Sequence, residues 1–166
     1  KVGDVFEVKI SDTKKKYMQY IASDLTQLNS DVVRGFSKTY DIDAKPMLKE
    51  IVSDAIDFYA HCDSRYGMRL ELWTLYGNIQ DTGDLKKPIF RDTNDAGDVI
   101  STRWYIWHIN EDFVSVDNKD LRLKESYYGV VYPAKMIFFR IQIRKKVQKY
   151  YLLIFLRLIT VKTPLI

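Results

Sequence analysis

The sequence predicts an α+β protein that is mostly β, a single domain built on a bent antiparallel sheet or half-open barrel with one or two short helices. Aromatic residues make up 14% of the 166 residues, with twelve tyrosines, and such side chains suit a half-buried sheet. Many short segments alternate apolar and polar residues with the period of a strand. Turn-forming residues separate these segments. Bending or closing a small sheet protects its edges, which favours this architecture.

The first forty residues are predicted to form three strands. Residues 2–10 and 15–22 alternate on either side of the polar turn 11–14, a pattern typical of a hairpin. Residues 31–40 follow as a third strand. Gly35 lies inside it, and a glycine within a strand indicates a bulge or a bend.

The middle of the chain mixes helices with strands. A proline begins the segment 46–52, which we expect to be a short helix because proline suits a first helical turn. Residues 54–62 alternate as a strand. Residues 68–76 fit either a strand or two turns of helix, and we expect a second short helix near 64–75. The polar residues 77–86 form a loop.

The last third of the predicted sheet contains the most aromatic strand. Further strands are expected at 88–91, 102–110, 113–116 and 127–132. Aromatic residues on both sides of 102–110 predict burial on both faces, or burial combined with a binding surface. One face carries Trp104, Ile106 and His108, and the other carries Tyr105, Trp107 and Ile109.

The charge of the chain is unevenly distributed. The formal net charge is +4, but residues 126–166 hold eight lysines and arginines and no acid, which leaves the first 125 residues at −4. We therefore expect a β-rich domain over 1–133 and a basic, apolar C-terminal tail over 134–166, docked on the same domain. The apolar stretch 150–159 is too short to span a bilayer, so no transmembrane segment is expected.

Few residues offer catalytic or metal chemistry. The one cysteine excludes an intramolecular disulfide and favours a reducing, cytoplasmic environment. Cys62 follows His61 in a predicted strand, so their side chains point to opposite faces and form no dyad. Too few ligands are present for a zinc site. An aspartate-rich turn starting at Asp92 departs from a calcium loop, because Arg103 stands where a bidentate acid belongs. We expect no enzyme activity, metal or cofactor.

The N-terminal strands carry a family resemblance. The chain resembles the bacterial immunity protein 26 family, which protects cells from their own polymorphic toxins. The resemblance implies a mostly β, non-catalytic protein that binds and neutralises a cognate toxin protein, and the family supplies no catalytic residues. It is most specific over the first forty positions and extends loosely to residue 132. The residues that carry it are Val2-Gly3-Asp4-Val5-Phe6, Tyr17, Gln19-Tyr20-Ile21 and Asp31-Val32-Val33-Arg34, with further similarity at Trp73, Gly77, Asn78 and Gly129-Val130-Val131.

The acidic body predicts the kind of partner. Acidic surfaces attract basic proteins and speed their capture, so a basic toxin such as a nuclease fits this chain. Tryptophan is also common where interfaces are tightest. The predicted contacts are the exposed members of a set of aspartates and tryptophans: Asp24, Asp31, Asp54, Asp57, Asp63, Trp73, Trp104 and Trp107.

Two alternatives remain open. A nucleic-acid-binding tail would combine cations for phosphates with aromatic rings for bases; the cations are Arg140, Arg144, Lys145, Lys146 and Lys149, among Phe138, Phe139, Tyr150 and Tyr151. An enzyme with an unusual acid–base site would need a polar pocket that holds a carboxyl group of shifted pKa.

Overall fold

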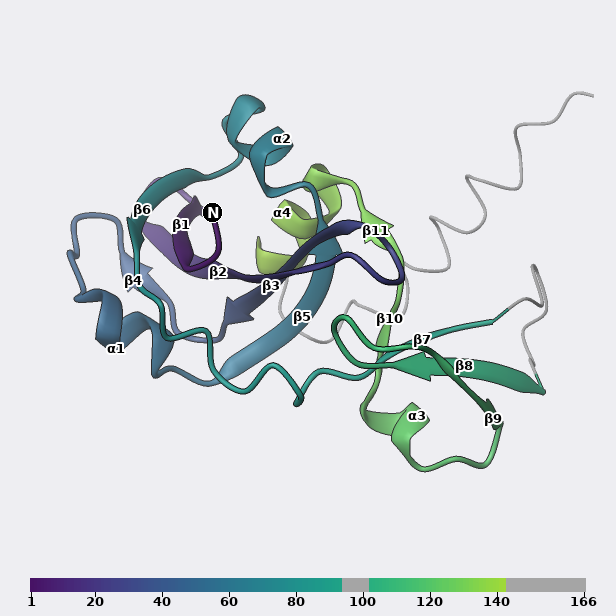
Figure 1. The fold of residues 1–166 in the computed structure, drawn as a ribbon. Coiled ribbons are helices and arrows are strands. Elements are labelled where there is room, and N and C mark those ends of the chain that lie inside the picture. The colour runs from purple at the N-terminus through teal and green to yellow at the C-terminus, as the bar shows by residue number, and fades with distance from the viewer. Residues whose placement is uncertain (94–101, 143–166) are drawn as a thin grey trace, which may run out of the picture.

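The computed structural model describes residues 1–93 and 102–142, which form two open sheets and four short helices (Figure 1). The large sheet has the strand order β11 (Val131–Tyr132), β5 (Ile56–Cys62), β3 (Ser30–Phe36), β2 (Lys14–Asp24), β1 (Asp4–Lys9) and β6 (Thr74–Asn78), with β4 (Tyr40–Asp41) paired to β2. The small sheet has the order β10 (Tyr127–Tyr128), β7 (Phe90–Asp92), β8 (Arg103–Trp107) and β9 (Val114–Asp117). The helices are α1 (Leu48–Val52), α2 (Ser64–Arg69), α3 (Arg122–Glu125) and α4 (Ala134–Gln142). The predicted mostly β, α+β class is therefore confirmed, and neither sheet closes into a barrel.

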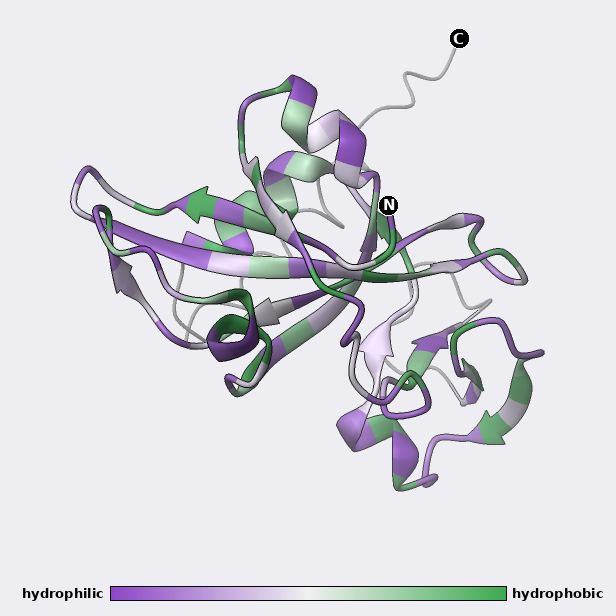
Figure 2. Cartoon of the chain, turned by 60° about the vertical axis from the view of Figure 1, so that its left-hand side comes forward, coloured by the Kyte–Doolittle hydropathy of each residue, from purple (hydrophilic) through white to green (hydrophobic). Residues whose placement is uncertain are grey.

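The pairing of the large sheet follows the alternation of the sequence (Figure 2). In the β1–β2 hairpin Phe6 lies opposite Met18 and Val5 opposite Gln19, so odd and even positions separate onto two faces. The register between β3 and β5 shifts after Gly35, which confirms the bulge predicted there. Among the described strands, only the short β10 and β11 pair in parallel with their neighbours, β7 and β5.

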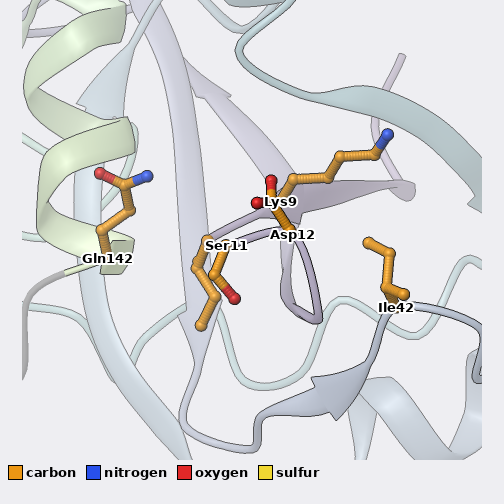
Figure 3. Close-up of a pocket in the computed structure, with 6 residues that line it drawn as sticks. Lys9, Ser11, Asp12, Ile42 and Gln142 are labelled. Atoms are coloured by element: carbon orange, nitrogen blue, oxygen red, sulfur yellow. The ribbon is translucent and has the colours of Figure 1, made fainter.

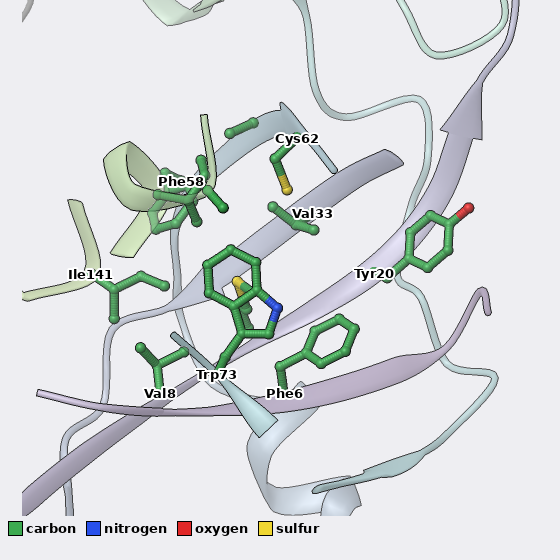
Figure 4. Packing of buried hydrophobic residues seen from close by; sticks show 12 residues of the cluster. Phe6, Val8, Tyr20, Val33, Phe58, Cys62, Trp73 and Ile141 are labelled. Carbon is green, nitrogen blue, oxygen red and sulfur yellow. The ribbon is translucent and has the colours of Figure 1, made fainter. Parts of the chain in front are cut away.

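One face of the large sheet is covered by α4 (Figure 4). Ala134, Ile137 and Ile141 recur at helical spacing and are all buried against this face. Residues 134–142 therefore belong to the same core as the strands before them. The buried members of this cluster are Phe6, Val8, Met18, Tyr20, Val33, Phe58, Ala60, Cys62, Trp73, Ala134, Ile137 and Ile141.

The opposite face is covered by two separate structures. At one end α1 and β4 pack on Val5, Tyr17 and Phe36. At the other end the small sheet contributes Phe90 and Trp107 to a cluster with residues of β2, β3 and β5. This second contact joins the two sheets into one hydrophobic interior.

Between these two clusters, the segment that connects β6 to β7 crosses the large sheet and is held there by hydrogen bonds to polar side chains of the sheet. Gln19 donates to the carbonyl oxygens of Ile79 (3.0 Å) and Asp81 (3.2 Å). Arg34 donates to Gln19 Oε1 and to the carbonyl oxygen of Asp81, both at 2.9 Å. Burial lowers the pKa of Arg34. Its buried guanidinium therefore bonds largely to neutral oxygens. These bonds fix the segment between β6 and β7 to the large sheet.

Several predicted boundaries were wrong for tertiary reasons. The ambiguous stretch 68–76 covers the end of α2 and the start of β6, with the buried Trp73 between them. The third predicted strand divides into β3 and β4. The single strand expected at 127–132 is two strands, β10 and β11, which join different sheets. Gly129 between them leaves room for the ring of Trp107, since a Cβ there would lie 1.9 Å from the ring.

A substitution at Gly129 tests this close approach. Gly129→Ala should lower the free energy of unfolding by about 2 kcal/mol, because the added methyl group overpacks the junction of the sheets. Gly77→Ala is the matched control: its Cβ would meet only the tip of Leu48, 3.0 Å away. Urea unfolding followed by circular dichroism measures both. Equal stability of the two variants would contradict the packing.

Candidate functional site

The most concentrated group of buried polar side chains lies where the two sheets meet. Asp24 at the end of β2 is fully buried and accepts bonds from both sheets. One carboxylate oxygen accepts from His61 Nε2 of β5 at 3.0 Å and from Trp107 Nε1 of β8 at 3.1 Å. The other accepts the backbone N–H groups of Asn110 (3.2 Å) and Gln27 (3.4 Å). One carboxylate thus connects four segments of the chain.

Asn110 strengthens the same junction from the loop after β8. Its positive φ of 61° is a left-handed conformation that asparagine tolerates better than most residues. Its side chain donates to the carbonyl oxygen of Ser23 at 2.8 Å and accepts the N–H of Leu25 at 2.8 Å. The turn after β2 and the turn after β8 therefore satisfy each other's backbone groups.

The protonation states at this junction follow from burial and hydrogen bonding. Burial alone would raise the pKa of Asp24, but the bonds from His61, Asn110 and Trp107 outweigh it and hold the pKa below its ordinary value. Burial lowers the pKa of His61 despite the attraction of Asp24. Asp24 is therefore ionised and His61 neutral at pH 7. The neutral ring must carry its proton on Nε2 to donate to the carboxylate.

This group is closed to substrates. The rings of His61 and Phe90 lie 4.1 Å apart between centroids, and the side chains of His61 and Asp24 are fully buried. Within residues 1–93 and 102–142, no group forms a hydrogen bond with the buried His61 Nδ1. An acid–base pair needs access to a substrate, so the arrangement joins the sheets rather than forming a catalytic site.

Cys62 is equally remote from reactive chemistry. It packs in the cluster under α4, on the face of the sheet opposite His61, as the alternation of the strand predicts. Burial raises the pKa of its thiol far above the ordinary value, with the charges of Asp31 and Asp63 adding to the effect. A thiol in this state is a poor nucleophile.

Three of the eight candidate partner contacts are buried, so they are not among the exposed members to which the prediction applies. Asp24 and Trp107 bond to each other at the junction of the sheets. Trp73 is buried between α2 and the large sheet, where its Nε1 donates to the carbonyl oxygen of Ser64 at 3.0 Å. The sequence shows the residue types but not their tertiary partners, and buried polar groups are retained where such partners exist.

The other predicted aspartates reach the surface to different degrees. Asp63 is exposed and caps α2 by accepting the N–H of Tyr66 at 2.8 Å. Asp54 accepts the N–H groups of Lys38 and Ala55. Asp31 accepts two bonds from Ser64, and Asp57 on β5 is partly exposed. Their role as partner contacts stays a prediction.

Trp104 lies on the opposite face of the small sheet from Trp107, as the predicted alternation requires. It is partly exposed, and the guanidinium carbon of Arg91 lies 5.3 Å from its ring centroid and 4.5 Å from that of Tyr128. Arg91 also donates to the carbonyl oxygen of Leu123 at 2.6 Å. This arginine therefore connects α3 with side chains of β8 and β10 on one face of the small sheet.

The predicted nucleic-acid contacts fall mostly beyond the described residues, since Arg144, Lys145, Lys146 and Lys149 lie outside them. Arg140 is described and lies over the ring of Phe58, with 4.4 Å between its guanidinium carbon and the ring centroid. Burial lowers its pKa. Arg140 therefore covers the core under α4. Its guanidinium is less accessible to a phosphate there than it would be in an exposed tail.

A shallow depression of about 350 Å³ lies between the turn after β1, Ile42 and the end of α4, lined also by Lys9, Asp12 and Gln142 (Figure 3). Within residues 1–93 and 102–142, no three histidine, cysteine or acidic side chains gather as metal ligands. No helix in these ranges is long and apolar enough to cross a membrane.

The sequence-based reasoning missed an exposed apolar and acidic surface beside β9. Phe113 directly precedes β9, and Val114 is its first residue. Their exposed fractions are 55% and 54%. Glu111 and Asp112 come directly before them and are exposed. The signal in the sequence was a pair of acids next to two apolar residues.

Comparison with models of protein families, with curated proteins and with solved structures finds no match to this chain.

The buried junction predicts a pH dependence of stability. His61 has a lowered pKa when folded, so below its ordinary value of 6.5 only the unfolded chain takes up the proton. The free energy of unfolding should therefore fall between about pH 7.5 and about pH 5.5. His61→Gln keeps a donor for Asp24 and should flatten this fall, whereas His108→Gln should leave it unchanged. Urea titrations at several pH values test this, and an unaltered slope in His61→Gln would contradict it.

The contribution of the Asp24 charge to stability can be measured with a matched pair of variants. Asp24→Asn should lower the free energy of unfolding by about 2–3 kcal/mol, because bonds to a charged acceptor are replaced and an amide faces buried donors. Asp63→Asn should change it little, since asparagine caps a helix as well as aspartate does. Thermal unfolding of both variants measures the difference. Similar melting temperatures would show that the buried charge contributes nothing.

Proposed function

We propose that this chain is a non-catalytic, immunity-type protein that binds and neutralises a cognate protein toxin. The observation that carries the proposal is the contrast between the buried reactive side chains and the side chains at the surface. The groups with the most reactive potential, His61, Cys62 and Asp24, are sealed inside, while exposed acidic and apolar side chains occupy the surface. A protein of this kind acts through its surface rather than through a pocket.

The positions that carry the family resemblance support a shared architecture. Gly3 has a positive φ of 91°, and a Cβ there would lie 2.7 Å from the carbonyl oxygen of Ile79. Asp4 accepts the side-chain amide of Asn78 at 2.8 Å. Gln19 holds the crossing connection, and Trp73 fills the core. Each of these four positions has a structural role, so a relative that shares them would share this architecture and could differ in its partner-binding surface.

The charge of the chain up to residue 125 supports a basic toxin as the partner. Net negative charge steers a positively charged protein toward the surface and raises the association rate. A toxin that acts on nucleic acid needs such a basic surface to hold phosphates. Binding there would cover the part of the toxin that contacts its substrate.

The proposal is tested by capture followed by rescue. The full chain, immobilised, should retain one protein in stoichiometric amount from nuclease-treated lysate of its own cells. That protein, expressed alone in a bacterial host, should stop growth, and coexpression of this chain should restore growth. The association rate should fall steeply as salt rises, because steering by charge is screened.

Two results would contradict the proposal. A captured protein that is harmless when expressed alone would exclude a toxin–immunity pair. Recovery of nucleic acid alone from a parallel lysate without nuclease, and of no protein from the treated lysate, would replace the proposal with the nucleic-acid-binding alternative.

A further inference from the structure

β9 is an outer strand of the small sheet. It pairs with β8 on one side, with Ile106 opposite Val114 and Trp104 opposite Val116. No other strand among the described residues pairs with it. Its outward backbone N–H and C=O groups therefore form a row able to pair with another extended chain.

The side chains along this edge favour an added strand over open solvent. Phe113 and Val114 are more than half exposed, and Val116 is partly exposed. Phe113 meets Tyr105 edge to face, with 5.0 Å between ring centroids, so its ring is held in place beside the strand. Figure 2 shows this apolar strand at the outer margin of the small sheet. Natural edges usually carry lysine, proline or a bulge that prevents pairing, and β9 itself lacks lysine and proline.

The charges around β9 are acidic. Glu111, Asp112 and Asp117 are exposed, and residues 108–117 contain no lysine or arginine. The cations nearest in sequence or pairing are Lys119, two residues beyond the strand, and Arg103, opposite Asp117. No ion pair of Glu111, Asp112 or Asp117 is found among the described side chains. The edge thus presents a net negative surface.

We propose that β9 binds an extended basic segment of the partner protein as an added strand. Backbone bonds along β9 would hold the segment, and its apolar side chains would cover Phe113 and Val114. Its lysines or arginines would face Glu111, Asp112 and Asp117. The inference rests on the proposed function, in that the partner is a protein, and it assigns the place and the manner of binding.

Charge favours this occupant over a second copy of the chain. Two copies paired through β9 would bring two sets of the same acidic residues together, and like charges near each other oppose association. A basic segment instead gains both the backbone bonds and the opposite charges. Peptide recognition by strand addition combines these two contributions, affinity from the main chain and specificity from the side chains.

The inference is tested with a peptide of defined composition. The probe is a peptide of alternating lysine and valine, about the length of one strand, added to the full chain. Amide hydrogen exchange should slow about tenfold at the outward amides of β9 at saturation, with little change in β6 or α2. The same peptide N-methylated at alternate residues, and a peptide of alternating glutamate and valine, should not bind.

Charge reversal provides the matched variants. Glu111→Lys with Asp112→Lys should weaken peptide binding about tenfold. Asp12→Lys with Asp43→Lys, an exposed pair in other turns, changes the net charge equally and should leave binding unchanged. Circular dichroism confirms that both variants are folded. Equal loss in both variants would reduce the effect to overall charge and overturn the assignment to β9.

Failure of this inference is distinguishable from failure of the proposed function. A captured toxin whose binding protects β6 or α2, but not β9, would overturn the inference and leave the function standing. Protection of β9 by the peptide, without any toxin partner in the cells, would overturn the proposed function and leave binding of a basic strand at β9 standing. A dimer in light scattering, with β9 protected in the absence of peptide, would identify a second copy as the occupant and overturn the inference.

Discussion

The structure depends on the buried charge of Asp24. An ionised carboxylate away from water is stable only when hydrogen bonds replace its hydration. Here the donors come from the large sheet through His61 and from the small sheet and its following turn through Trp107 and Asn110. Moving the small sheet away would leave the charge without half of its partners. The two sheets are therefore held in one arrangement by a polar requirement as well as by the apolar contacts of Phe90 and Trp107.

This constraint also explains why the His61–Asp24 pair is enclosed. A histidine beside an aspartate is often part of a catalytic pair. Here the ring of His61 is neutral, enclosed and packed against Phe90 with 58° between the two ring planes. Gln19 and Arg34 likewise serve to anchor a crossing connection. These polar groups belong to the interior. On the outside, β9 combines apolar and acidic side chains with an edge that no other strand of the described residues pairs.

Local patterns were sufficient where a single rule decided the outcome. Alternation in 2–10 and 15–22 predicted the first hairpin, and Gly35 predicted the shift in register beside it. The opposite faces of Trp104 and Trp107 followed from their separation along one strand. The pattern failed at 127–132, because nothing in a run of six residues indicates that its halves join different sheets. It also left undecided which of the candidate aspartates and tryptophans are exposed, and the structure buries Asp24, Trp73 and Trp107, because residue type alone does not reveal tertiary partners.

The sequence by itself determined the class of the fold, the faces of most strands and the absence of a disulfide, because these follow from periodicity and composition. Only the tertiary structure decided which polar residues are internal and which edge is open. The reason is physical: burial of Asp24 depends on donors from residues more than eighty positions away in the chain. The exposure of β9 depends equally on the path of every strand that could have paired with it. Such contacts belong to the assembled sheets and have no signature in any local stretch of sequence.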